Sequence, residues 1–229
     1  MSYSVQNIRN VCLVGHSGNG KTALAESLLF MTGAINRMGN SADGNTVCDY
    51  DPEEIKRKIT ISTSIAPVNF GGCKINILDC PGFFDFAGDA RCAMRAAEAG
   101  MIFCTAKDGI AVGAERSWKY LKNANMPCMF YISKTDEDHG DFAGVLSALQ
   151  DKYGSAVCAV TAPMSDGTGV IDLVHNVAYQ TKGNKTEKIA VPAADADMVE
   201  SLRERRRCSP FSSGCDPINR PTERTKFVP

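Results

Sequence analysis

The sequence lacks the features that mark membrane, secreted and DNA-binding proteins. Its longest apolar stretches fall well short of a bilayer span, and no N-terminal signal peptide is visible. Its 25 basic and 26 acidic residues nearly cancel, so the overall charge requires neither nucleic acid nor an anionic membrane as a partner. Its ten cysteines include no C-x-x-C pair. We therefore expect a cytoplasmic protein with reduced cysteines, no membrane partner and no sequence-specific DNA partner.

The most specific motif is an octapeptide that fits the phosphate-loop pattern G-x-x-x-x-G-K-[ST]. It consists of Gly15, His16, Ser17, Gly18, Asn19, Gly20, Lys21 and Thr22. An apolar run at residues 11–14 precedes it and a helical pattern follows it, which is the setting that such a loop requires. The glycines let backbone N–H groups turn toward phosphates, the Lys21 ammonium can reach the outer oxygens, and the Thr22 hydroxyl can bind Mg²⁺. The loop predicts a bound nucleoside triphosphate.

A second motif, Asp79-Cys80-Pro81-Gly82, directly follows an expected strand at residues 74–78. Asp79 can hold Mg²⁺ directly or through water, and the Gly82 N–H can face the γ-phosphate. A D-x-x-G sequence alone is also compatible with an ordinary turn. Its place at a strand end, about sixty residues after the phosphate loop, favours the functional interpretation.

A third motif, Ser133-Lys134-Thr135-Asp136, resembles the guanine-reading sequence N-K-x-D. Asp136 can accept both the N1–H and the 2-amino hydrogens of guanine, whereas adenine offers no such pair of donors. Lys134 can lie across the base. Ser133 replaces an amide with a shorter hydroxyl, so we expect a weakened affinity for guanine but a retained preference for GTP and GDP over ATP. A polar strand end followed by a helix cap is the alternative.

Residues 33–58 show no sustained periodicity and contain several Gly and Asn residues. A loop of this length is usually a functional lid or disordered, and its position after the phosphate loop suits a segment that closes over a γ-phosphate. Thr60 ends this loop, and its hydroxyl can complete the Mg²⁺ shell when a γ-phosphate is present. The alternative is that Thr60 is simply a β-branched strand residue.

The remaining pattern predicts an α/β fold with the P-loop NTPase architecture. A hairpin is expected over residues 59–70 and 74–78, with a Gly71-Gly72 turn, and Pro67 requires the first of these strands to lie at a sheet edge. The expected helices are residues 88–99, 114–124 and 141–152, and the expected strands between them are residues 101–105 and 127–133. This alternation predicts a mixed, mostly parallel sheet with helices on both faces and a nucleotide at the carboxyl ends of its strands.

Five motifs in a fixed order carry a resemblance to a known family. They are the phosphate loop, residues 49–54, Ile59-Thr60-Ile61, Asp79-Cys80-Pro81-Gly82 and Ser133-Lys134-Thr135-Asp136. Together they resemble the GTPase domain of elongation factor G, and most closely its elongation-factor-G-like paralogues, over about residues 7–200. The resemblance implies a translational GTPase that acts on the ribosome, requires Mg²⁺, and uses Lys21, Thr60 and Gly82 in hydrolysis. We also expect the protein to be a monomer.

Three departures from that family limit what the resemblance implies. Phe83 stands where the family has a histidine that orients the attacking water, and an apolar ring can neither align nor deprotonate water. Lys58 replaces a glycine before Ile59. The family's later domains are absent, so the chain resembles a truncated form. These departures leave open a GTP hydrolase, a GTP-binding switch with little or no hydrolysis, and an inactive fragment.

The domain organisation predicted from the sequence has three parts. Residues 1–155 form the GTP-binding core. Residues 156–207 are either the start of an inserted subdomain, as the resemblance implies, or the last core strand at 157–160 with a closing helix at 170–177. The first alternative leaves the core sheet with an open edge. A helix is expected over residues 193–207, and the proline-dotted residues 208–229 are expected to be unstructured.

Overall fold

The computed structural model describes residues 3–154, 156–182 and 185–207. It contains two compact units, Met1–Asp141 and Phe142–Pro229. The tail predicted for residues 208–229 lies outside the described residues. In the described part of the chain, no helix has the length and apolar character that crossing a bilayer requires.

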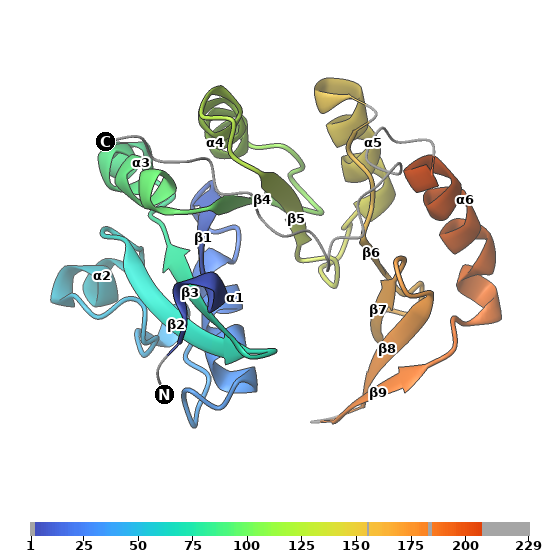
Figure 1. Cartoon of the computed structure of the whole chain (residues 1–229), viewed down its shortest axis with the longest axis horizontal. Coiled ribbons are helices and arrows are strands. Elements are labelled where there is room, and N and C mark those ends of the chain that lie inside the picture. Colours follow the sequence, from blue (N-terminus) through green and yellow to red (C-terminus); the bar gives the residue numbers. More distant parts are fainter. Residues whose placement is uncertain (1–2, 155, 183–184, 208–229) are drawn as a thin grey trace. The chain divides into compact units, whose positions relative to one another are not determined.

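The first unit is built on a five-stranded sheet with the order β2-β3-β1-β4-β5 (Figure 1). The strands are β1 (Ile8–Gly15), β2 (Ser64–Phe70), β3 (Cys73–Asp79), β4 (Ala99–Thr105) and β5 (Cys128–Ser133). Strand β1 pairs in parallel with β3 and β4, and β4 pairs in parallel with β5, whereas β2 runs antiparallel to β3. The mixed, mostly parallel sheet confirms the predicted fold class.

The predicted hairpin is present as β2 and β3. Gly71 and Gly72 join these strands with φ of 57° and 77°, and such positive values suit glycine because it has no Cβ. Pro67 lies in β2, at the edge of the sheet, as predicted. The strand begins at Ser64, however, and not at residue 59.

Helices cover both faces of this sheet because successive strand residues point to opposite sides. The helices are α1 (Lys21–Met31), α2 (Pro52–Arg57), α3 (Ala87–Ala96) and α4 (Val112–Asn123), with 3₁₀ turns η1 (Val5–Asn7), η2 (Ser41–Asp43) and η3 (Phe84–Phe86). On one face, Leu13 and Phe103 form a buried cluster with Leu29 of α1. Helices α3 and α4 contact β1, and α4 also contacts β4, where Gly100 leaves room for the Leu121 side chain. The phosphate loop directly follows β1, so it lies at the carboxyl end of this strand, and β3 runs parallel beside it.

The expectation of a long loop without regular structure is wrong for its second half. Helix α2 begins with a capping box, in which the Asp51 side chain accepts from the Glu53 N–H and Glu54 accepts from the Asp51 N–H. Pro52 occupies the first helical position, where its missing N–H costs nothing. The sequence Asp-Pro-Glu-Glu is therefore a helix start that the periodicity alone did not reveal.

The described residues of the second unit form two α-helices and a separate antiparallel sheet with the order β6-β7-β8-β9. Its elements are α5 (Phe142–Tyr153), β6 (Thr161–Pro163), β7 (Gly169–Asp172), β8 (Val177–Lys182), β9 (Lys185–Ile189), η4 (Ala193–Asp195) and α6 (Ala196–Arg207). Ile171, Leu173 and Ala178 are buried in its core. The helix predicted over residues 193–207 is confirmed.

The alternative that completes the core sheet with residues 157–160 and a helix at 170–177 is wrong. Residues 157–160 form no strand, and among the described residues β5 pairs only with β4. Asp172 accepts hydrogen bonds from the backbone N–H groups of Val174 and His175, and this turn competes with helix formation. The apolar spacing at 170–177 fits a helix, but the local turn produces β7 and β8 instead.

Four of the cysteines in the described part of the chain are small buried side chains, whereas Cys92 and Cys128 are exposed. Cys12, Cys48, Cys80 and Cys104 are buried, and none of them forms a disulfide. Burial raises the pKa of Cys12 and of Cys48 to about 12, so these thiols stay protonated at neutral pH. They contribute to packing and not to nucleophilic chemistry.

Candidate nucleotide-binding site

The phosphate loop turns tightly between β1 and α1. Gly15, Gly18 and Gly20 have φ of 137°, 79° and 83°, a region that side chains with a Cβ avoid. A Cβ on Gly15 would lie 2.8 Å from the Phe103 carbonyl oxygen. Gly20 is the N-cap of α1 and brings no side-chain cap, so the first N–H groups of this helix remain available to an anion.

The Lys21 side chain lies buried beneath this loop. Only 6% of the residue is exposed, and its Nζ donates to the His16 carbonyl oxygen at 2.8 Å. Desolvation lowers the pKa of Lys21, while the nearby Asp79 carboxylate opposes this by favouring the charged form. An ammonium has three donors, so the one bond to His16 leaves capacity for phosphate oxygens.

Asp79 ends β3 as a fully buried residue whose carboxylate oxygens accept no hydrogen bond from a described residue. Burial raises its pKa to about 6, although the nearby Thr22 hydroxyl and Lys21 ammonium lower it. A buried carboxylate left in this state fits a hard cation. Among the described residues no three His, Cys, Asp or Glu side chains gather as a metal cage. A single carboxylate, that of Asp79, fits Mg²⁺, which commonly binds proteins through one carboxylate together with phosphates and water.

The end of the long loop closes on the phosphate loop. The Thr60 hydroxyl oxygen lies 3.3 Å from that of Thr22 and donates to Asp49 Oδ1 at 2.8 Å. Asp49 is buried and also accepts from the Thr46 hydroxyl at 3.1 Å. Residue spacing in the sequence predicted no individual role for Asp49. In the structure, Asp49 sets the position of the predicted metal ligand Thr60.

Two further buried carboxylates hold this loop, and neither was predicted from the sequence. Glu26 of α1 is fully buried and accepts from the backbone N–H groups of Val47 at 2.6 Å and Gly39 at 3.0 Å. Glu54 of α2 accepts from the Ile61 N–H at 2.9 Å. A carboxylate within the apolar stretch of α1 was the available signal for Glu26. The loop is thus fixed from both ends by hydrogen bonds from its backbone.

The D-x-x-G turn packs directly against the phosphate loop. A Cβ on Gly82 would lie 2.5 Å from the Ser17 nitrogen and 2.7 Å from the His16 carbonyl carbon. A Cβ on Gly113, at the start of α4, would lie 2.8 Å from the His16 Cα. Only glycine allows this approach. Phe83 follows Gly82 with 39% of its surface exposed, so an apolar ring stands beside the turn.

Ser133 joins the guanine-reading motif to the phosphate loop through a hydrogen bond to Asn19. Its hydroxyl lies 2.9 Å from the Asn19 carbonyl oxygen and 3.1 Å from that of Cys104, so one proton is shared between two carbonyls. The Asn19 side chain in turn donates to the Phe103 carbonyl oxygen at 3.1 Å. Ser133 therefore has a structural role. Its comparison with the asparagine of the N-K-x-D motif did not indicate this role.

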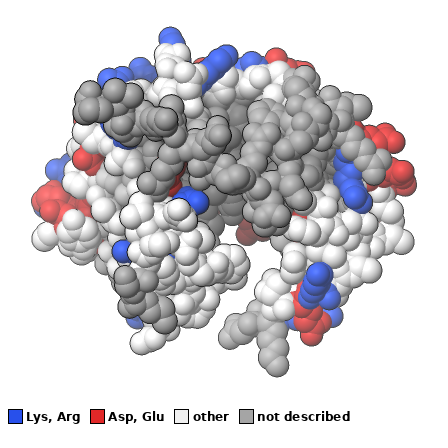
Figure 2. All heavy atoms as spheres, viewed as in Figure 1, with Lys and Arg blue, Asp and Glu red and all other residues white. Residues whose placement is uncertain are grey.

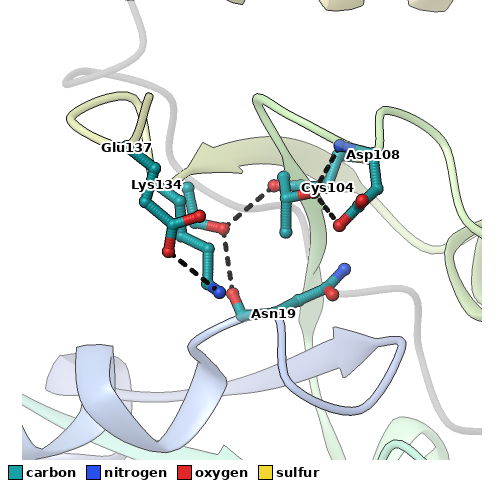
Figure 3. A network of polar contacts seen from close by, with 7 residues as sticks. Asn19, Cys104, Asp108, Lys134 and Glu137 are labelled. Carbon is teal, nitrogen blue, oxygen red and sulfur yellow. Dashed lines mark hydrogen bonds and ion pairs between the residues drawn. The ribbon is translucent and has the colours of Figure 1, made fainter. Parts of the chain in front are cut away.

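The rest of the motif is more exposed. Lys134 has φ of 58°, and its Nζ lies 3.1 Å from Glu137 Oε1, an ion pair that Figure 3 draws above Asn19. Asp136 is exposed on the same loop. The structure thus brings Lys21, Thr22, Thr60 and Asp79 together and connects Ser133 to them, whereas Asp136 faces solvent.

Comparison with known proteins places this site in context. Residues 6–208 match the family described as the elongation factor Tu GTP binding domain. An elongation factor G-like protein of Mycobacterium tuberculosis is 32% identical over 196 residues, which cover 86% of this chain and 27% of that protein. An elongation factor G-like protein of Synechocystis is 34% identical over 203 residues, which cover 87% of this chain and 30% of that protein. A crystal structure of a protein from Thermus thermophilus superposes with a TM-score of 0.82 at 36% identity. The superposition covers 87% of this chain and 30% of the Thermus chain. The chain therefore spans less than a third of the length of these relatives.

Proposed function

Since the chain belongs to the elongation factor Tu GTP binding domain family and is a translational GTPase domain, we propose that residues 15–22 and 133–136 bind GTP and GDP. One observation carries the proposal. Lys21 and Asp79 are both buried and close enough to interact electrostatically, and neither has its hydrogen-bonding capacity filled by described residues. The Lys21 ammonium and the unpaired N–H groups at the start of α1 can bind a polyphosphate, and the Asp79 carboxylate can bind the cation that accompanies it.

Each part of the site has a role in this proposal. Backbone N–H groups of the phosphate loop and the Lys21 ammonium hold the phosphates, and the Gly82 N–H senses the γ-phosphate. Asp136 accepts from guanine and Lys134 lies across the base, which requires Lys134 to exchange its ion pair with Glu137. We assign GTP binding to residues 1–155 and an additional subdomain to residues 156–207.

Mg²⁺ binding is part of the proposal, through Thr22, Thr60 and Asp79. The Thr60 hydroxyl already donates its proton to Asp49, which leaves its oxygen lone pairs free for a cation. When bound, Mg²⁺ would neutralise charge on the β- and γ-phosphates. Asp49 fixes Thr60 in the orientation that this requires.

We further propose that the domain hydrolyses GTP on the ribosome, as a monomer in the cytoplasm. The names of its relatives support a role in translation, but the chain spans less than a third of their length. A second candidate is a GTP-binding switch with little hydrolysis. Phe83 favours it, because this apolar side chain beside Gly82 cannot orient a water molecule.

Calorimetric titration separates nucleotide binding from hydrolysis. GTP with Mg²⁺ should bind more tightly than ATP with Mg²⁺, and GTP at a hundredfold its Kd should stabilise the fold by about 2.7 kcal/mol. Equal affinity for both nucleotides, or no heat with GTP, would exclude the proposal. Steady-state phosphate release with and without ribosomes then decides between the two candidates, because tight binding without turnover leaves only the switch.

A further inference from the structure

A cavity of about 480 Å³ opens between α3 and α4, on the side of the D-x-x-G turn. Its buried lining includes Ala90 and Met94 of α3 and Ser117 of α4. Phe83 and Phe84 form an aromatic wall. The volume falls within the range of about 300–1,000 Å³ that is typical of small-molecule sites. The nucleotide-binding motifs account for the turn but not for this cavity.

The charged side chains that line the cavity all carry one sign. They are Arg91 of α3 and Arg116 and Lys119 of α4, and no Asp or Glu is among the lining residues that the structure describes. Figure 2 shows Lys and Arg side chains gathered over α3 and α4, at the upper left of this face. The protein as a whole has a net charge of −1, so three cations without a carboxylate are a local feature.

These cations are available to a ligand. Arg91 and Lys119 form no ion pair with any residue that the structure describes, and both are exposed at the cavity rim. The Arg116 guanidinium lies 4.3 Å above the centre of the Phe84 ring, an arrangement that orients its donors beside an aromatic surface. The cavity is thus lined by buried apolar side chains of α3, by the aromatic rings of Phe83 and Phe84, and by cationic side chains of α3 and α4.

We propose that this cavity is a binding site for a small organic anion with an aromatic body. The aromatic body would lie on Ala90 and Met94 against Phe84, where it buries apolar surface. Its carboxylate, phosphate or sulfonate would lie among Arg116, Lys119 and Arg91, which offer charge-assisted hydrogen bonds. Because Gly82 and Phe83 also line the cavity, the ligand would contact the turn of the D-x-x-G motif.

The fluorescent probe 8-anilinonaphthalene-1-sulfonate has this chemistry and tests the proposal on the whole chain without nucleotide. We expect saturable binding to one site. Arg116→Gln and Lys119→Gln should each raise the probe Kd about threefold to tenfold, because each removes a charged donor. The matched controls Arg95→Gln on α3 and Lys122→Gln on α4 lie outside the cavity lining and should leave the Kd unchanged.

A variant that fills the cavity provides a second measurement. Ala87→Phe, on the lining of α3, should abolish probe binding while thermal melting shows a folded protein. The neutral analogue N-phenyl-1-naphthylamine should bind more weakly than the sulfonate. Equal affinity for both probes, or equal losses in the cavity and control variants, would overturn the proposal.

The GTP proposal and this one can fail separately. Lys21→Ala, which removes a proposed phosphate ligand, should leave probe binding unchanged, and excess GTP with Mg²⁺ should not displace the probe competitively. Competitive displacement would place the probe in the nucleotide site and overturn the inference. Probe binding that persists when calorimetry detects no GTP binding would support the cavity and refute only the nucleotide assignment.

Discussion

The two ends of the proposed nucleotide site differ in how far their charges are removed from water. At the phosphate end, Lys21, Asp49 and Asp79 are buried, with at most 6% of any of them exposed. At the base end, Asp136 is exposed and the Lys134 side chain is 38% exposed in its ion pair with Glu137. Burial of charges costs free energy in the folded protein, whereas exposed charges cost little. We infer that the phosphate end is assembled before ligand arrives and the base end is completed by it.

The largest expected effect comes from Lys21→Ala. Loss of the ammonium removes charged hydrogen bonds to phosphate, which together amount to about 4 kcal/mol, or a Kd for GTP about a thousandfold higher. Calorimetric titration with GTP and Mg²⁺ measures this change. Lys122→Ala, which removes an exposed cation stacked on Trp118, is the control and should leave the Kd unchanged. A similar loss in both variants would mean that Lys21 does not contact phosphate.

The next effect concerns the pH dependence of stability at Asp79. Burial raises its pKa to about 6 from the ordinary 3.8, so the folded protein holds this proton more tightly than the unfolded chain does. The stabilising contribution of the protonated group is complete below about pH 4 and is lost as the pH rises through 6, a change of up to about 3 kcal/mol.

Asp79→Asn should remove this dependence. Relative to the parent protein, the free energy of unfolding of the variant should rise between pH 4.5 and pH 7, as measured by urea denaturation at both values. Asp136→Asn, at the exposed end, should follow the parent at both pH values. Parallel pH profiles for the parent and Asp79→Asn would show that Asp79 is not desolvated, and the contrast between the two ends would lose its basis.

Much of the fold could be predicted because the motifs require specific local structure. The phosphate-loop sequence needs a strand before it and a helix after it, and β1 and α1 are both present. Gly71-Gly72 and Pro67 predicted a hairpin at the sheet edge because each residue restricts the backbone. The second unit was harder. Apolar residues at 170–177 satisfy helical spacing, but the hydrogen bonds to Asp172 form a turn, and β7 and β8 pair with each other on either side of it.

The candidate site was predicted less completely than the fold. Motif spacing found Lys21, Thr60 and Asp79, but the roles of the carboxylates that hold the long loop depend on contacts with residues distant in the sequence. A glutamate in a helix is usually exposed to solvent, so its type alone does not predict that Glu26 is buried. Glu26 can be buried because the backbone N–H groups of Gly39 and Val47 donate hydrogen bonds to it. The roles of the site residues toward nucleotide stay predictions, since spacing fixes position and not affinity.

The smallest of these effects is expected at the base end. Asp136→Asn replaces a charged acceptor of two guanine hydrogens with an amide, which should weaken GTP binding by about 2 kcal/mol, or about thirtyfold in Kd. Because Asp136 is exposed, the melting temperature without nucleotide should not change. Asp138→Asn, an exposed neighbour on the same loop, is the matched control for both measurements. A lowered melting temperature in Asp136→Asn alone would show that the base end is preassembled like the phosphate end, while an unchanged Kd would remove Asp136 from the guanine contact.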